Sequence, residues 1–167
     1  MKRFLRIVDG ISKGFGELCF WLTLVLLVLV FGGAVSRYVF NAPIKWVPEL
    51  SQFVFGASFM LAGAVTLMWN GHVRIDALVD RLSPRAQAIL ELVVSVFFWL
   101  FCGTLLYQGG IMAWESVEVW ETSGTFWDPP VWPIKVVVPL SVILLMLQGV
   151  AKFIRDWHVA TTGKEIE

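Results

Sequence analysis

The chain has 167 residues, of which 57% are hydrophobic and only 16% are charged, and its mean hydropathy is +0.75. Soluble domains average about 25% charged residues, so this composition is typical of a protein embedded in lipid. The formal net charge is zero, which offers no basic surface for nucleic acid. The two cysteines, Cys19 and Cys102, lie in apolar runs without metal-ligand spacing, and we expect no cofactor.

The N-terminal segment, residues 1–17, places basic and apolar residues at helical spacing. Two interpretations stay open: an amphipathic helix on the membrane surface, or a basic flank of a signal-anchor helix. Residues 18–36 follow without a single charge. This run of about 28 Å as a helix matches the hydrocarbon thickness of a bilayer. Because it is too long for the apolar part of a signal peptide, it predicts a first transmembrane helix.

A turn at residues 37–50 organises the first predicted hairpin and reads Arg-Tyr-Val-Phe-Asn-Ala-Pro-Ile-Lys-Trp-Val-Pro-Glu-Leu. Arg37 at its start could pair with Glu49 near its end and pin the hairpin. An exposed pair of this kind contributes only about 0–1 kcal/mol. Trp46 is interpreted most simply as an aromatic anchor at the membrane interface.

The second apolar run, residues 50–69, is rich in small residues. Small side chains let helix backbones approach closely in lipid. We expect a second transmembrane helix whose small residues pack against a partner, with permissive lipid-facing positions as the alternative. The residues of this face that we single out are Gly56, Ser58, Ala62 and Gly63.

A polar stretch, residues 70–91, separates the two predicted hairpins and begins with the helix-stopping pair Asn-Gly. Its alternating apolar and charged residues are suited to lying along the membrane interface. His72, Arg74 and Asp76 either pair with charges of a partner loop or remain solvated. The third uncharged run, residues 92–114, is long enough to span a bilayer with some tilt.

The last turn and the last run complete the pattern. Glu115, Glu118 and Glu121 stand three residues apart, which indicates a solvated acidic face more than a cation site. The fourth run, residues 132–151, begins with a Trp-Pro pair suited to a helix start, and Pro139 is a candidate kink.

These four runs predict an all-α membrane protein: one domain over residues 1–167, with four transmembrane helices and short interfacial helices. Ten Lys and Arg residues lie in the N-terminal segment, the 70–91 stretch and the C-terminal tail. Only three lie in or beside the other two turns. This asymmetry predicts that both termini are cytoplasmic.

The interiors of the four runs contain no Asp, Glu, Arg or His. An ion-coupled pathway needs ionisable or polar groups near the membrane midplane, and haem ligation there needs histidine. The pattern therefore favours a subunit that packs against others and is not an enzyme. Three hypotheses remain: a transporter scaffold subunit, a membrane anchor or assembly subunit of another complex, and a homo-oligomeric channel.

Two motifs resemble the small membrane subunit of the tripartite ATP-independent periplasmic (TRAP) transporters. The resemblance extends over nearly the whole chain, and the Pro129–Lys135 segment adds a weaker signal. The matching positions lie in the first turn and in the polar stretch between the hairpins; they are Arg37, Asn41, Pro43, Trp46 and Glu49, and His72, Arg74 and Asp76.

The resemblance implies a multi-pass protein of the bacterial inner membrane that belongs to a sodium-coupled secondary transporter. In that family a small four-helix subunit braces a large membrane subunit, which carries the substrate and sodium sites. A soluble periplasmic binding protein delivers the substrate, often an organic acid. The implied partners are thus the large subunit, the binding protein and membrane lipid.

Overall fold

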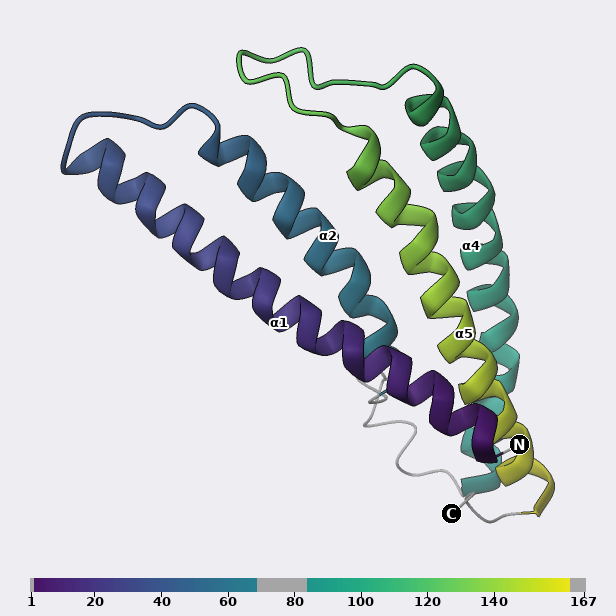
Figure 1. The fold of residues 1–167 in the computed structure, drawn as a ribbon. Helices are drawn as coiled ribbons and strands as arrows, with labels where there is room; N and C mark the ends of the chain where they lie inside the picture. Colours follow the sequence, from purple (N-terminus) through teal and green to yellow (C-terminus); the bar gives the residue numbers. More distant parts are fainter. Residues whose placement is uncertain (1, 69–83, 163–167) are drawn as a thin grey trace.

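The computed structural model describes residues 2–68 and 84–162, which fold into four long helices (Figure 1). The helices are α1 (Lys2–Tyr38), α2 (Val47–Met68), α4 (Pro84–Glu118) and α5 (Trp132–Thr162). Each is long and apolar enough to cross a membrane. The described residues contain no β-strand, only an isolated bridge between Thr122 and Pro130. The prediction of an all-α membrane protein with four membrane-spanning helices is confirmed.

The helices pack in the order α1, α2, α5, α4, so α2 and α5 form the central pair. The start of α1 and the end of α5 lie together, and we call this the terminal end. The opposite end carries the turns 39–46 and 119–131, and we call it the turn end. The two hairpins converge at the terminal end and diverge toward the turn end (Figure 1).

The N-terminal segment does not form a separate surface helix, because α1 continues without a break from Lys2 to Tyr38. Leu5 and Val8 are buried against Ala151 of α5, with Leu147 beside them. The helical spacing of apolar residues in this segment is therefore explained by packing on α5.

Helix α2 packs against α1 on one side and α5 on another. Leu61 and Ala64 form a buried cluster with Leu144 of α5, and Phe15 and Cys19 of α1 pack onto it. Nearer the turn end, α1 and α2 approach so closely that a Cβ atom at Gly33 would lie 2.7 Å from Val47. Such contacts fix the first hairpin.

Helices α4 and α5 also depend on a glycine contact. A Cβ atom at Gly149 of α5 would lie 2.4 Å from a ring carbon of Phe98 on α4, so only glycine leaves room for that ring. Pro139 lies inside α5, and the helix continues through it.

Burial is distributed unevenly among the helices. The most apolar 18-residue window of α1 contains no buried residue and that of α4 only 6%, against 33% in both α2 and α5. The chain therefore leaves most of the apolar surface of its two outer helices for lipid or a partner.

Candidate functional site

The candidate site lies at the turn end. The backbone of its first turn, residues 39–46, explains why one motif residue is asparagine. After α1 ends at Tyr38, Asn41 adopts a left-handed conformation with φ 49°, and the Ala42 N–H donates a 3.0 Å hydrogen bond to the Ser36 carbonyl. Asparagine enters this region more readily than most residues, because its short polar side chain bonds locally. Pro43, which follows, is exposed.

The second turn, residues 119–131, folds back on itself. The Val131 N–H donates to the Glu121 carbonyl over 2.9 Å, and the Ser123 N–H donates to the Pro129 carbonyl over 3.0 Å. At the tip, Asp128 accepts a hydrogen bond from the Gly124 N–H. These bonds give the turn a defined shape without help from a partner.

The first turn and the start of α2 contact the second turn, which the sequence does not predict. The Thr125 hydroxyl donates a 2.8 Å hydrogen bond to the Glu49 carboxylate. The Trp46 and Trp127 rings lie 6.0 Å apart, and the Lys45 ammonium is 4.1 Å from the centre of the Phe126 ring, a cation–π distance. We call these six residues the turn-end contact: Lys45, Trp46, Glu49, Thr125, Phe126 and Trp127.

The anticipated pair of Arg37 and Glu49 is not formed. Glu49 is engaged by Thr125, and the Arg37 guanidinium lies 5.7 Å from the Tyr38 ring on an exposed turn of α1. Glu49 therefore links the two hairpins to each other, where the sequence suggested a link within the first.

The three acidic residues Glu115, Glu118 and Glu121 do not form a cluster. Glu115 and Glu118 are exposed on α4, whereas Glu121 forms an ion pair with Lys135 of α5. The hydrogen bond from Lys135 holds the pKa of Glu121 below its ordinary value. Within the described ranges, His, Cys, Asp and Glu side chains form no group that could hold a metal ion.

The small residues of α2 point in different directions. Ser58 is buried, and its carbonyl accepts a weak hydrogen bond from the Cys19 thiol. A Cβ atom at Gly63 would be 4.0 Å from Leu145 of α5, while one at Gly56 would have no atom within 4 Å. Ala62 is half-buried. Ser58 and Gly63 thus serve packing within the chain, whereas a side chain at Gly56 would meet open space.

Three further motif residues, His72, Arg74 and Asp76, lie outside the described residues. Their pairing with a partner loop remains a prediction.

A polar network that joins α1 to α5 at the terminal end was not predicted from the sequence. The buried Gln148 amide of α5 donates a 2.7 Å hydrogen bond to Ser12 of α1 and longer ones to the Val8 carbonyl and Asp9. Arg155 forms a 2.7 Å ion pair with Asp9. These bonds fasten the first turns of α1 to the last turns of α5.

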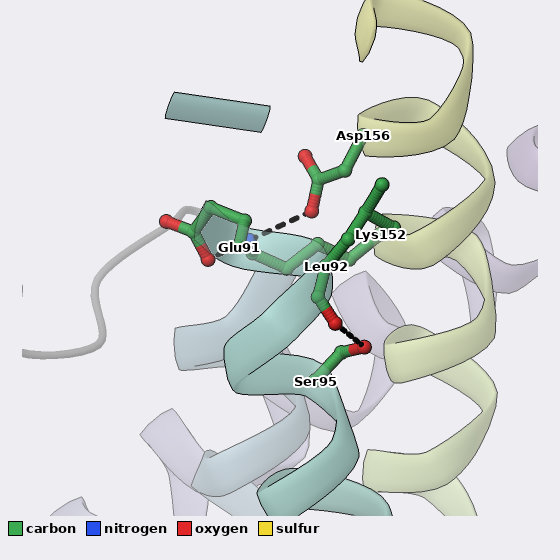
Figure 2. Close-up of polar contacts among 5 residues, drawn as sticks. All are labelled: Glu91, Leu92, Ser95, Lys152 and Asp156. Atoms are coloured by element: carbon green, nitrogen blue, oxygen red, sulfur yellow. Dashed lines mark hydrogen bonds and ion pairs between the residues drawn. The ribbon is translucent and has the colours of Figure 1, made fainter. Parts of the chain in front are cut away.

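The same region of α5 also binds α4. Figure 2 shows Lys152 reaching between Glu91 of α4, at 2.6 Å, and Asp156 of α5, at 3.0 Å. Ser95 is drawn nearby and donates to the Leu92 carbonyl in its own helix. Gln148, Lys152 and Arg155 are four and three residues apart, so they share one face of α5. This spacing of polar residues was the feature of the sequence that could have predicted the network.

Four apolar helices tied by polar contacts at both ends define a multi-pass membrane subunit. Residues 26–159 match the family model described as "Tripartite ATP-independent periplasmic transporters, DctQ component". The chain therefore belongs to this family of transporter components. It is a TRAP transporter small permease subunit.

Two relatives agree with this assignment. The chain is 32% identical over 99 residues to a Haemophilus influenzae protein with the provisional name TRAP transporter small permease protein, over 59% of this chain and 61% of that one. It is 29% identical over 120 residues to the isethionate TRAP transporter permease protein DctMQ of Oleidesulfovibrio alaskensis. That match covers 70% of this chain but only 19% of the relative, so the chain spans less than two thirds of either protein.

Proposed function

We propose that this small permease subunit is a scaffold that braces the large membrane subunit of a sodium-coupled TRAP transporter. The observation that carries the proposal is the absence of any buried residue in the most apolar window of α1 and the near absence in that of α4. A chain that buries so little of its own outer helices has surface available for a second membrane protein.

The size of one relative supports a large partner. In the Oleidesulfovibrio permease, the region similar to this chain is joined to a polypeptide several times longer. We infer that the region described here is a single membrane domain that packs against an equivalent larger part. Gly56, where a Cβ atom would meet nothing within 4 Å, offers room for the close approach of a partner helix.

The substrate and the coupling ion belong to that partner in this proposal. The interiors of the four apolar runs contain no Asp, Glu, Arg or His, so the chain itself offers no acidic or histidine site at the membrane midplane. The isethionate of the relative's name is an organic sulfonate. It agrees with our proposal that the complete transporter takes up an organic acid together with sodium.

We propose further that the chain lies in the bacterial inner membrane with both termini cytoplasmic. The turn end then faces the periplasm, where a substrate-binding protein docks. The turn-end contact is the candidate docking surface, because its aromatic rings are held in place by the contact between the turns. Exposed Phe126 and half-exposed Trp127 supply the aromatic surface that interfaces favour.

Purification of the tagged chain from its own host in mild detergent, followed by mass spectrometry, tests the scaffold role. We expect a large polytopic membrane protein in constant ratio. A pure homo-oligomer would overturn the scaffold and favour a channel, and flavin or iron–sulfur subunits would favour the anchor of another complex.

Variants of the turn end then test the docking surface. We expect Trp46→Ala and Glu49→Ala to lower uptake by the complete transporter severalfold, because both side chains hold the two turns together. Glu118→Ala is the matched control, since Glu118 is exposed at the end of α4 and is not one of the six residues of the turn-end contact. Equal uptake in all three variants would contradict the role of the turn-end contact.

A further inference from the structure

The first turns of α1 carry basic side chains that none of the contacts among the described residues uses. Arg3, Arg6 and Lys13 are exposed. At 3.6 residues per turn they fall within a sector about 80° wide, on the side of α1 opposite Leu5, Val8 and Ser12. We call Arg3, Arg6 and Lys13 the α1 basic face.

The direction of this face is fixed by the rest of the fold. Leu5 and Val8 are buried against α5, and the Asp9–Arg155 ion pair and the Gln148–Ser12 hydrogen bond hold the same turns. Helix α1 therefore cannot rotate to bring its bases toward α5. Asp9, the acid nearest to them in sequence, is already paired with Arg155 of α5.

An apolar line runs beside the basic face. Ile7, Ile11 and Leu18 are exposed and share the adjacent side of α1, and from Leu18 the helix continues into its uncharged run. One acid, the exposed Glu17, lies in the same sector as the bases. Three bases against one acid leave the face with a net positive charge beside a path into the hydrocarbon.

We propose that the α1 basic face binds the headgroups of anionic phospholipids in the leaflet that surrounds the terminal end. Basic residues directly beside a membrane span attract negatively charged lipid, and each adds to the attraction. The adjacent apolar line accommodates an acyl chain of the same lipid. Charge complementarity and the continuity of α1 into the membrane both favour lipid over a soluble anion.

Native mass spectrometry of the full chain, released from micelles doped with phosphatidylglycerol or phosphatidylcholine, tests the proposal. We expect preferential retention of phosphatidylglycerol. Arg6→Gln with Lys13→Gln removes two charges and should lower that retention about thirtyfold. The matched control is Arg37→Gln with Lys45→Gln, which removes the same charge at the turn end. Equal retention of both lipids, or equal losses in the two double variants, would overturn the proposal.

Two further variants distinguish a loss of lipid binding from misfolding of the chain. Glu17→Gln removes the opposing charge and should increase phosphatidylglycerol retention, a gain that a misfolded chain would not give. Arg6→Lys with Lys13→Arg should keep it. Glycerophosphoglycerol, the headgroup without acyl chains, should compete poorly; competition as strong as that of intact lipid would identify a simple anion site instead. None of these measurements requires the large subunit, so they test the lipid proposal independently of the scaffold proposal.

Discussion

Gly149 occupies a position where the ring of Phe98 presses directly on the backbone of α5. The helices α4 and α5 can approach this closely only because Gly149 has no side chain. A Cβ atom there would lie 2.4 Å and 2.9 Å from two ring carbons, well inside the contact distance of carbon atoms. Gly149 therefore permits the close approach of the two helices at this point.

We expect Gly149→Ala to lower the free energy of unfolding by about 1–3 kcal/mol, because the ring must move or the helices must separate. Thermal unfolding in detergent, followed by tryptophan fluorescence, measures the effect. Gly103→Ala on α4 is the matched control, since a Cβ atom there meets nothing within 4 Å. Both variants gain the same helix propensity, so the difference between them isolates the steric term.

Adding Phe98→Leu to Gly149→Ala should restore part of the lost stability, because the smaller side chain vacates the space that the new methyl group needs. Identical unfolding temperatures for Gly149→Ala and Gly103→Ala would show that α4 and α5 adjust freely at this contact.

Single residues differ in how far the sequence reveals their role. Asn41 was singled out by its motif, and its left-handed backbone supplies a local reason for asparagine. Glu49 was singled out too, but its bond to Thr125 joins positions 76 residues apart. Neither spacing nor composition encodes such a contact, because it depends on how the two hairpins are placed in space.

Among the helices, α1 shows that its packing on α5 decides between two interpretations of its sequence pattern. Basic and apolar residues at helical spacing suit a surface helix as well as a packed one. The packed arrangement has a specific partner, because Gln148 of α5 is buried and donates to Ser12. The four apolar runs, in contrast, were predictable from composition alone, since spanning a bilayer requires length and the absence of charge.

We expect Gln148→Met to destabilise the chain by about 0.6–2 kcal/mol, because it keeps the volume but removes the hydrogen bonds to α1. The unfolding temperature in detergent is the measurement. Gln108→Met on α4 is a control of identical chemistry, as Gln108 is exposed.

The Gln148 variant also makes a positional prediction. Loss of the bond should increase amide hydrogen exchange in residues 5–12 of α1 more than near Tyr38, because the bond holds only the first turns of that helix. Uniform exchange along α1, or equal unfolding temperatures for the two glutamine variants, would mean that Leu5 and Val8 suffice to hold the segment.

At the scale of the whole molecule, the two hairpins are fastened at both ends. The terminal end is joined through α5 to α1 and α4 by ion pairs and hydrogen bonds. The turn end is joined through side chains of the two turns, where the helices have already diverged. A scaffold has to keep its shape while a partner moves, and fastening both ends of diverging helices limits their relative rotation.

Distances between spin labels measure this fastening directly. With Cys19 and Cys102 replaced, labels at Phe40 and Val119 report on the turn end, and both positions are exposed outside the turn-end contact. We expect Glu49→Gln with Thr125→Val to broaden the distance distribution and lengthen its mean, since the hydrogen bond between the turns is lost. Glu118→Gln, at an exposed site on α4, should leave the distribution unchanged.

A second label pair at Ile11 and Phe153 reports on the terminal end, where both positions are exposed. Its distribution should stay narrow in the Glu49 and Thr125 variant, because the Asp9–Arg155 pair and the Gln148 bonds are untouched. Broadening at both ends would mean that the chain loosens as one body. An unchanged turn end would mean that the Trp46–Trp127 contact alone holds the hairpins, and the hydrogen bond to Glu49 would then contribute only to the local shape of the turn.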